Sequence, residues 1–448
     1  MGMGWASRER TLVLGPVLAG LVYFFLDLGW EPRAQLVLAI TVLAVVYWFT
    51  EALPLHITGL LIAFLLILLG GFSPGEIFPL YFDPIVVLLL GGFVLAIALQ
   101  KHGLDHLIAH RVLSHLGEKP SMVLLGFMFL TAFLSLWMSN TASAALMIPI
   151  VLFVLHQNKL PLSTSSFAKA FILGVAYAAT VGGLGTLVGS TPNPLAAKYL
   201  GEMGMAFGFW DWMFYGLPFV LIFLFVIWGV VLRIYPPEIK RLRLRPHIEK
   251  LNKGQRLVIG IFLLTALLWA TDSLTKLSTS VVALVPILLL YLFRLLETED
   301  FKKVDWPILS LIGSGIVLGS AFQATGIDAH LAALISAHAV GLPIFLLIFL
   351  LAVVGIIVTM FASNTASAAL MIPLTIPLAP ALGIPVEVIV VVTAIAASID
   401  FTAPMGTPPN AIAYSTGAVT VPQMAKTGLL LSLLAALLLS AFATFVWM

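Results

Sequence analysis

Long runs of apolar residues, separated by short polar segments, cover most of the sequence. A run of about 20 apolar residues is the length that one helix needs to cross the hydrocarbon core of a bilayer. Because backbone groups in lipid must be hydrogen-bonded internally, we predict an all-α polytopic membrane protein with about 11 transmembrane helices. The runs that fit a single crossing lie at about residues 11–30, 35–50, 57–72, 85–100, 166–186, 210–234, 256–273, 279–295, 307–324, 386–403 and 427–447.

The composition agrees with a chain that is solvated by lipid. Of the 448 residues, 61% are hydrophobic and 9% are charged, whereas soluble domains carry about 25% charged residues. The net charge of +2 is too small to indicate a nucleic-acid partner, and the absence of cysteine excludes disulfides, thiolate metal sites and cysteine nucleophiles. The first apolar run, Thr11 to Trp30, is too long for the core of a signal peptide, so we interpret it as the first span.

Basic residues predict the orientation, because Lys and Arg are retained on the cytoplasmic side of a membrane. They cluster near the N-terminus, in 101–119, in 235–256 and in 294–303, and alternating spans place all four segments on one side. We therefore predict a multi-pass protein of the cytoplasmic (inner) membrane with a cytoplasmic N-terminus and an extracytoplasmic C-terminus. Segment 235–256 is predicted to be a cytoplasmic linker between a first half, 1–234, and a second half, 257–448.

The two halves contain the same motifs in the same order. The sequence Ser-Asn-Thr-Ala-Ser-Ala-Ala-Leu-Met-Ile-Pro occurs at 139–149 and again, unchanged, at 363–373, and a Pro-Asn motif follows at 189–193 and at 406–410. Basic residues flank the first copy, whereas residues 304–425 contain no Lys or Arg. The copies are therefore predicted to form an inverted-topology repeat, which is typical of secondary transporters with a substrate site near the midplane.

Both Ser-Asn-Thr motifs interrupt apolar stretches, at 121–157 and at 344–380. Each arm could be a full span or half of a re-entrant hairpin, and polar residues of this kind can also hold packed helices together. Two identical copies favour re-entrant hairpins, because Ser, Asn and Thr are good N-caps. The positive end of the helix that follows each tip would then point at an anion.

Gly and Pro residues crowd into two further apolar segments, which we predict to be broken helices over 166–203 and 386–417. Pro blocks the helical hydrogen-bond pattern, and unwound backbone at membrane depth persists where it lines a buried or wet cavity. The freed carbonyls and nearby hydroxyls would suit a small hard cation, with a simple kink as the alternative. Asp400 lies in the second segment, where a carboxylate indicates either a functional group or a partner for local backbone donors.

Other chemistry is weakly represented. His102, His106 and His110 share one helical face at a spacing that could bind a metal, but the segment is basic and amphipathic, so we favour a cytoplasmic interfacial helix. The chain has no His-Glu-x-x-His motif and no cluster of catalytic carboxylates near a His. An enzyme is therefore not expected.

Several motifs resemble the divalent anion/sodium symporter family over nearly the whole chain. They are Thr-Glu-Ala-Leu-Pro-Leu at 50–55, Leu-Gly-Gly-Phe at 90–93, both Ser-Asn-Thr tips and both Pro-Asn motifs. The resemblance implies a homodimer in which each protomer has a scaffold domain and a transport domain that holds the two hairpins. It also implies alternating access by an elevator-like movement, with Na⁺ as the coupling ion and no other cofactor.

The resemblance also implies which residues form the sites. Those of the first sodium site would be Ser135, Ser139, Asn140 and Gly189. Those of the second would be Thr359, Ala362, Asn364 and Gly406. Those that meet the anion would be Ser139, Asn140, Thr141, Ser190, Thr191, Ser363, Asn364, Thr365, Thr407 and Pro408. Asp400 departs from the family, in which we expect an apolar residue, and is a candidate modulator of substrate charge or of proton coupling.

These observations predict a sodium-coupled transporter of small di- or tricarboxylates of the succinate, malate or fumarate type. No Lys or Arg lies beside the second-copy motifs, so a dianion at the midplane must be neutralised by other means. Helix N-termini supply roughly half a charge each, and bound sodium ions would supply the rest. The alternatives are a sodium-independent or proton-coupled exchanger, including one for sulfate or citrate, and an anion channel.

Overall fold

The computed structural model describes residues 5–26, 29–104, 107, 117–243, 251–271, 275–327, 330, 342–404 and 406–448. Every regular element in these ranges is a helix, which confirms the predicted all-α fold. His106 and His110 lie outside the described residues, so the interfacial helix stays a prediction.

The helices of the first half run from the N-terminus to the polar linker. They are α1 (Trp5–Phe25), α2 (Pro32–Thr50), α3 (Leu55–Leu68), α4 (Pro74–Ile77), η1 (Phe78–Phe82), α5 (Pro84–Lys101), α7 (Pro120–Ser135), α8 (Asn140–Gln157), α9 (Ser166–Gly182), η2 (Gly183–Gly185), α10 (Pro192–Glu202) and α11 (Phe209–Ile234). Several begin with Pro in their first turn, where its missing N–H costs no hydrogen bond.

The helices of the second half follow the linker. They are α12 (Lys253–Ala270), α14 (Thr279–Leu292), α15 (Thr298–Phe301), α16 (Trp306–Thr325), α18 (Ile344–Phe361), α19 (Asn364–Thr375), α20 (Leu378–Leu382), α21 (Val386–Ala396), α22 (Pro408–Ser415), α23 (Val421–Phe442) and the π-helical turn η3 (Ala443–Trp447).

Eight helices in the described part of the chain are long and apolar enough to cross a membrane. They are Pro32–Thr50, Pro74–Lys101, Asn140–Gln157, Ser166–Gly185, Phe209–Ile234, Trp306–Thr325, Ile344–Phe361 and Val421–Trp447. Shorter apolar helices occupy other predicted spans, among them α3, α14 and α21. One predicted span, 386–403, ends early, because α21 stops at Ala396, where the Pro-rich segment begins. In the other broken helix, α9 stops at Gly182 and the 3-10 turn η2 continues to Gly185.

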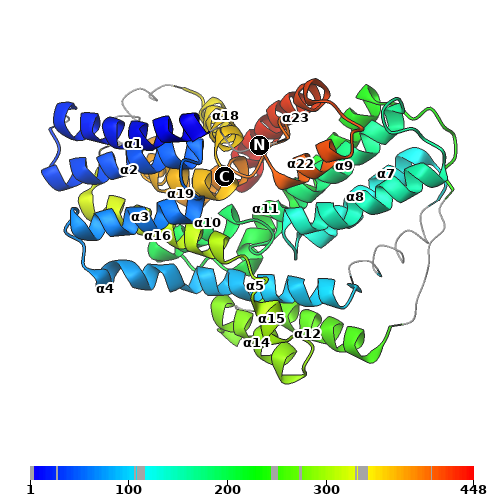
Figure 1. Cartoon of the computed structure of the whole chain (residues 1–448), viewed down its shortest axis with the longest axis horizontal. Helices are drawn as coiled ribbons and strands as arrows, with labels where there is room; N and C mark the ends of the chain where they lie inside the picture. The colour runs from blue at the N-terminus through cyan, green and yellow to red at the C-terminus, as the bar shows by residue number, and fades with distance from the viewer. Residues whose placement is uncertain are drawn as a thin grey trace.

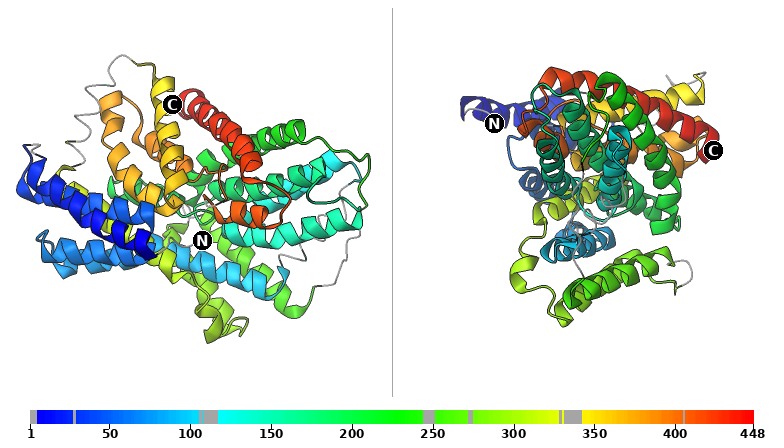
Figure 2. Two further views of the ribbon diagram at one scale, coloured as in Figure 1. Left: turned by 45° about the horizontal axis from the view of Figure 1, so that its top comes forward. Right: turned by 90° about the vertical axis from the view of Figure 1, so that its right-hand side faces the viewer.

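The helices form two groups that lie side by side (Figure 1). In one group α1 packs on α2, α2 on α3 and α3 on α16, while α5 packs on α14, which contacts α12. Helices α12 and α14 lie at one edge of the molecule, next to α5 (Figure 2). The other group contains α7 to α11 and α18 to α23, and contacts between α16 and α19 and between α5 and α10 join the groups.

The second group interleaves the two halves of the chain. Helix α22, from the second half, packs on α8 and α9 of the first half, whereas α10, from the first half, packs on α19 and α21 of the second. In the left view of Figure 2 the helices α7 and α8 lie on one side of the unwound segments, and α18 and α19 lie on the other. Each broken helix therefore brings its second segment to the hairpin of the other half.

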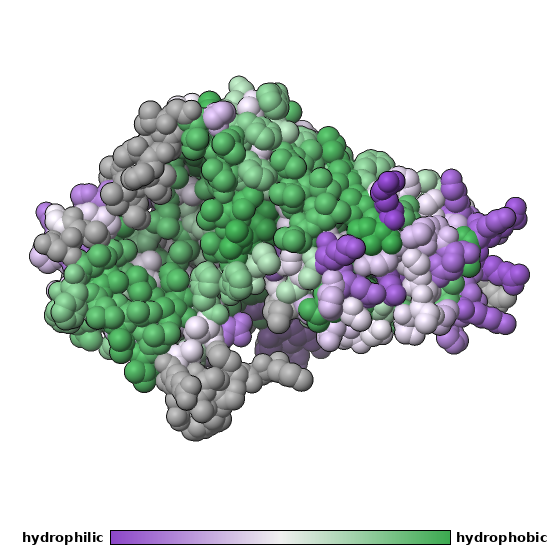
Figure 3. All heavy atoms as spheres, turned by 90° about the horizontal axis from the view of Figure 1, so that it is seen from above, coloured by the Kyte–Doolittle hydropathy of each residue, from purple (hydrophilic) through white to green (hydrophobic). Residues whose placement is uncertain are grey.

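Burial separates the helices at the centre from those that face lipid. The segment Ser166–Gly185 is 94% buried, whereas Ile344–Phe361 is 28% buried and exposes apolar side chains such as Leu350 and Val354. Figure 3 shows apolar atoms over most of one face and hydrophilic atoms gathered toward one end. The exposed helix faces match hydrocarbon, and the central helices position the motifs.

Candidate functional site

Both Ser-Asn-Thr motifs lie where one helix ends and the next begins. Ser139 is the N-cap of α8, and its Oγ accepts the backbone N–H of Ala142 at 3.2 Å. Ser363 is the N-cap of α19, and its Oγ accepts the N–H of Ala366 at the same distance of 3.2 Å. Each cap satisfies one of the free N–H groups of a helix start, and the remaining groups and the helix dipole favour an anion there.

A hydroxyl, an amide oxygen and a backbone carbonyl meet beside the first tip. Ser135 Oγ lies 2.8 Å from Asn140 Oδ1 and 2.6 Å from the carbonyl oxygen of Ala179. The hydroxyl has one proton and can donate to only one of these two acceptors at a time. Three oxygens with a single proton are a donor set that suits a small hard cation.

The second tip has the same three groups in the same arrangement. Thr359 Oγ1 lies 2.9 Å from Asn364 Oδ1 and 2.7 Å from the carbonyl oxygen of Ala397. Ala179 lies in the last turn of α9, and Ala397 is the C-cap of α21, so both are close to the unwound segments. We refer to these two groups of three residues as the first and the second oxygen cluster.

The Asn of the first Pro-Asn motif holds the unwound backbone of its own copy. Asn193 Nδ2 donates to the carbonyl oxygens of Gly183, at 2.8 Å, and Thr186, at 2.7 Å. Thr186 Oγ1 also donates to the carbonyl of Leu136, next to the first tip. The first broken helix is therefore tied to the first hairpin by side-chain hydrogen bonds.

The second Pro-Asn motif repeats this arrangement with different neighbours. Asn410 Nδ2 donates to the carbonyl oxygens of Asp400, at 3.2 Å, and Ala403, at 3.1 Å. Asp400 Oδ1 accepts both the N–H and the hydroxyl of Thr402, at 3.0 and 2.9 Å. The backbone pattern of the first copy is thus preserved, although Asp400 and Ala403 occupy the places of Gly183 and Thr186.

Hydrogen bonds across the molecule join the two copies at the centre. Thr191 Oγ1 lies 2.5 Å from Thr365 Oγ1, at the tip of the second hairpin. Ser190 Oγ lies 3.3 Å from Ser398 Oγ, just after α21. The structure therefore brings Ser190 and Thr191 of the first half to the motifs of the second half, from which they are far apart in sequence.

Close backbone packing accounts for the glycines of the first copy. A Cβ on Gly189 would lie 2.6 Å from the carbonyl oxygen of Gly183 and 2.8 Å from that of Ser135. A Cβ on Gly183 would lie 2.2 Å from Asn140 Oδ1. The structure therefore gathers Ser135, Asn140 and Gly189, while Ser139 is exposed and caps α8.

The second predicted sodium site is gathered in part. Thr359 and Asn364 belong to the second oxygen cluster, and Ala362 is the C-cap of α18 between them. A Cβ on Gly406 would meet the carboxylate of Asp400, with Oδ2 at 1.7 Å, so Gly406 packs directly on this side chain.

The predicted anion-contacting residues differ in exposure. Ser139, Thr141 and Pro408 are exposed, Asn140, Ser363 and Asn364 are half-buried, and Thr365 and Thr407 are buried.

Four helices start at the motifs, namely α8, α10, α19 and α22. Lys198 in α10 lies 2.8 Å from Asp83 and 2.9 Å from Glu202, so two carboxylates already pair with its charge. The positive groups that the motifs themselves offer an anion are therefore the starts of these four helices.

Sequence reasoning missed the carbonyls of Ala179 and Ala397 and the side chains of Thr186 and Ser398. The carbonyls have no side-chain signal, and only their position just before each Gly- or Pro-rich segment could have indicated them. Thr186 and Ser398 lie in the predicted broken helices, but no repeated motif includes them.

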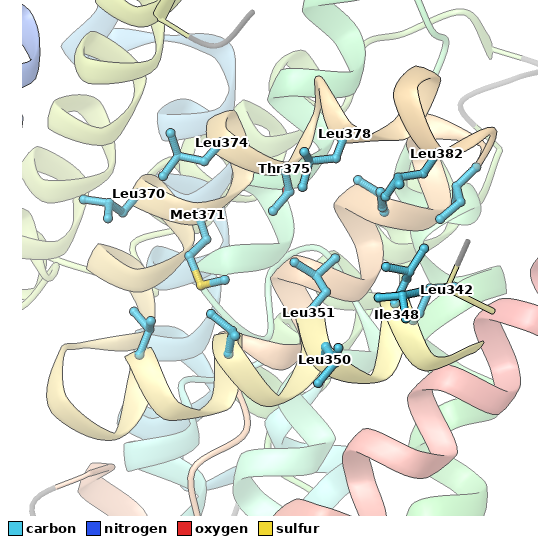
Figure 4. Close-up of a pocket in the computed structure, with 15 residues that line it drawn as sticks. Leu342, Ile348, Leu350, Leu351, Leu370, Met371, Leu374, Thr375, Leu378 and Leu382 are labelled. Carbon is cyan, nitrogen blue, oxygen red and sulfur yellow. The ribbon is translucent and has the colours of Figure 1, made fainter. Parts of the chain in front are cut away.

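An apolar cavity of about 490 Å³ lies between α18, α19, α20 and α21 and is lined almost entirely by aliphatic side chains (Figure 4). Thr375 is the one hydroxyl residue in its lining, and its Oγ1 is bonded to Ile372 O and Thr393 Oγ1. No Ser-Asn-Thr residue lines this cavity, so it offers nothing to an anion.

Comparison with known proteins agrees with the motifs. The citrate transporter family (CitMHS) matches residues 45–396 and 266–448. The chain is 31% identical to a sodium-dependent dicarboxylate transporter, SdcS, of Staphylococcus saprophyticus, with 94% of this chain and 88% of that protein aligned. It is equally 31% identical to the sodium-dependent dicarboxylate transporter SdcS of Staphylococcus aureus, with 97% and 90% aligned.

Solved structures show the same fold at low sequence identity. The YdaH transporter of Alcanivorax borkumensis superposes with a TM-score of 0.54 at 15% identity, covering 82% of this chain and 86% of that chain. MtrF of Neisseria gonorrhoeae superposes with a TM-score of 0.59 at 16% identity, covering 98% and 95%.

The membrane-spanning helices and these matches define a multi-pass secondary transporter. The chain belongs to the citrate transporter family, and its resemblance to divalent anion/sodium symporters is confirmed. Family membership also confirms that the chain is not an enzyme. The sequence Gly-x-Ser-x-Gly, which in some hydrolases marks a nucleophilic serine, occurs at residues 71–75. Here Ser73 is the N-cap of α4, and its Oγ accepts the N–H of Glu76.

Proposed function

We propose that the chain is a sodium-coupled symporter of small di- or tricarboxylates. The observation that carries the proposal is the duplicated oxygen cluster. In each copy a hydroxyl, an amide oxygen and a carbonyl converge beside the start of a helix. A cation bound in each cluster and the N-termini of α8 and α19 would together neutralise a dianion. The relatives named as sodium-dependent dicarboxylate transporters support the same substrate class.

Coupling follows from charge in this proposal. Residues 304–425 have no Lys or Arg, and Lys198 is paired with Asp83 and Glu202. An anion without a fixed cationic partner binds well only when sodium is already present, because burying an uncompensated charge is costly. Sodium and anion would therefore bind and cross together.

The proposed architecture has about 11 transmembrane helices and two re-entrant hairpins in an inverted repeat. The hairpins are the pairs α7–α8 and α18–α19, and they would move with the broken helices as a transport domain. Helices α1 to α5, α12, α14 and α16 would form the scaffold domain and the homodimer contact. The N-terminus would be cytoplasmic and the C-terminus extracytoplasmic.

The test is uptake of labelled succinate into proteoliposomes that contain the purified chain. We expect an inward sodium gradient to drive accumulation, and equimolar potassium or choline to leave it at the level of empty liposomes. Citrate, sulfate, malate and fumarate in excess would rank the substrates by competition. Accumulation that is equal with and without sodium, at a fixed pH, would instead indicate an exchanger or a proton-coupled carrier. Currents without counterflow would indicate a channel.

A further inference from the structure

The second broken helix contains a carboxylate at the place where the first contains glycine. Asn193 Nδ2 donates to the carbonyl of Gly183, and Asn410 Nδ2 donates to the carbonyl of Asp400. Both pairs are separated by ten residues, so Asp400 is the structural counterpart of Gly183. The repeat is therefore asymmetric at a position next to a proposed ion site.

Packing explains why only one copy has the carboxylate. A Cβ on Gly183 would lie 2.2 Å from Asn140 Oδ1, so no side chain fits there. In the second copy the carboxylate lies against Gly406, where a Cβ would be 1.7 Å from Asp400 Oδ2. Asp400 and Gly406 thus form a matched pair in which the glycine leaves the space that the carboxylate occupies.

The carboxylate is half satisfied. Oδ1 accepts two hydrogen bonds from Thr402, whereas Oδ2 is buried and has no hydrogen-bond partner. Asp400 is 0% exposed, and none of the ion pairs in the described residues includes it. A buried carboxylate oxygen in a membrane protein is costly unless a cation or a donor meets it.

Further oxygens of the same unwound segment also lack partners. Thr407 Oγ1 and Asn410 Oδ1 are buried without a hydrogen bond, which makes three such side-chain oxygens between residues 400 and 410, with residue 405 not described. The corresponding segment of the first copy, 183–193, has one, Asn193 Oδ1. The carboxylate and amide oxygens can only accept, and a hydroxyl oxygen can also coordinate a cation, so these atoms suit a cation better than an anion.

We propose that Asp400 Oδ2 is a ligand of the monovalent cation bound at the second broken helix, where Thr407 Oγ1 and Asn410 Oδ1 offer further oxygens. The inference rests on the proposed function, because it takes Na⁺ as the coupling ion. The second site then has an ionised ligand that the first site lacks. Its occupied form is neutral, so it binds sodium without needing the anion.

The test is sodium binding to the purified full-length chain in detergent without any substrate anion. The measurement is the thermal unfolding midpoint as NaCl replaces choline chloride at constant ionic strength and fixed pH. Asp400→Asn keeps the shape of the side chain and an acceptor for Thr402. We expect it to raise the sodium concentration for half-maximal stabilisation roughly tenfold or more, since losing even an outer-shell partner of a bound metal typically costs about 10- to 100-fold in affinity.

A second variant separates ligation from packing. Asp400→Ala combined with Gly406→Ala refills the space with a methyl group and removes the carboxylate, so we expect the same loss of sodium affinity. Sodium titrations of both variants that superimpose on the wild type would overturn the inference and leave the proposed function standing. A wild-type chain that shows no sodium-specific stabilisation would overturn the proposed function and the inference with it.

Discussion

The two copies of the repeat have the same hydrogen-bonded framework but differ in the residues that fill it. In each copy a hydroxyl four residues before the tip serine joins the tip Asn to the end of a central helix. In each copy another Asn holds two carbonyls of the unwound segment. These bonds hold backbone carbonyls at the helix ends and in the unwound segments, where the helical hydrogen-bond pattern is interrupted. The framework therefore explains why both copies keep the tip Asn and the Asn of the Pro-Asn motif.

The copies differ in how their hairpin tips are covered. Thr365, in the second tip, is 5% exposed and bonds to Thr191. Its counterpart Thr141 is exposed, and the counterpart of Thr191 is Pro408, which has no hydroxyl. Thr365 at the second tip is thus covered, whereas Thr141 at the first tip is exposed.

The largest effect on uptake is expected from substitution of the tip asparagines, Asn140 and Asn364, which make equivalent hydrogen bonds in the two copies. Asn140→Ala and Asn364→Ala each remove one amide oxygen from an oxygen cluster and one polar group from the proposed anion site. We expect each to lower sodium-driven succinate uptake roughly 100-fold or more. The measurement is initial uptake in proteoliposomes, normalised to protein that elutes as a single species on size exclusion. Wild-type uptake by either well-folded variant would remove that tip from the site.

A slightly smaller effect is expected in a labelling experiment that tests whether the first tip is more exposed than the second. The chain has no cysteine, so Thr141→Cys and Thr365→Cys each introduce a single thiol. A buried thiol reacts only after local opening, which costs free energy, so we expect Thr141→Cys to be labelled at least about tenfold faster by a water-soluble maleimide.

The labelling is measured in sodium-free detergent, with the cysteine-free wild type as background and a fully unfolded sample to normalise each thiol. Equal rates for the two variants would show that both tips are equally covered. A faster Thr365→Cys would show that the second tip is the more exposed one.

The hydroxyls of the oxygen clusters are expected to have a moderate effect. Ser135→Ala and Thr359→Ala each remove one proposed sodium ligand while leaving the amide and carbonyl oxygens. We expect each to raise the sodium concentration for half-maximal uptake roughly fivefold, because one neutral ligand contributes about 1 kcal/mol. Uptake at saturating sodium should change less.

Two matched variants sharpen this test. Thr359→Ser makes the second cluster identical to the first and should behave like the wild type. Thr131→Val removes a buried hydroxyl one turn before Ser135 that bonds only within its own helix, to Phe127 O, and should leave the sodium dependence unchanged. An unaltered sodium dependence in both alanine variants would argue against the clusters as ion sites.

Side-chain motifs could be predicted from the sequence, and backbone groups could not. The repeated Ser-Asn-Thr indicated N-caps at both tips, and Ser139 and Ser363 are N-caps in the structure. The carbonyls of Ala179 and Ala397 complete the oxygen clusters, but any residue at these positions would present the same carbonyl. The predicted span 386–403 extends beyond the end of α21 at Ala396, because the unwound segment is apolar and hydropathy does not distinguish it from a helix.

Contacts between the two halves also could not be predicted from the sequence. Thr191 was predicted to meet the anion, and nothing in the spacing indicated its hydrogen bond to Thr365, 174 residues away. The packing of Asp400 Oδ2 against Gly406 was equally hard to predict, because the two residues meet only in the folded backbone of the unwound segment. Periodicity and motifs establish the elements, and the packing of interleaved halves decides which residues meet.

The smallest effect is expected where the first copy has a tether that the second lacks. Thr186 Oγ1 donates to the carbonyl of Leu136 and lies 3.2 Å from the N–H of Gly189, whereas its counterpart Ala403 has no hydroxyl. Thr186→Val keeps the branched shape and removes both bonds, so we expect it to lower the free energy of unfolding by about 1–2 kcal/mol. Sodium dependence of uptake should be nearly unchanged, since the oxygen cluster of Ser135 remains.

The check is the thermal unfolding midpoint of Thr186→Val against that of Thr180→Val. Thr180 is equally buried, but its hydroxyl makes only a long bond of 3.5 Å within its own helix, to Ala176 O. The control should therefore lose less stability than Thr186→Val. If the two variants unfold at the same temperature, the hydroxyl of Thr186 does not hold the first tip, and the two hairpins are anchored by their asparagines alone.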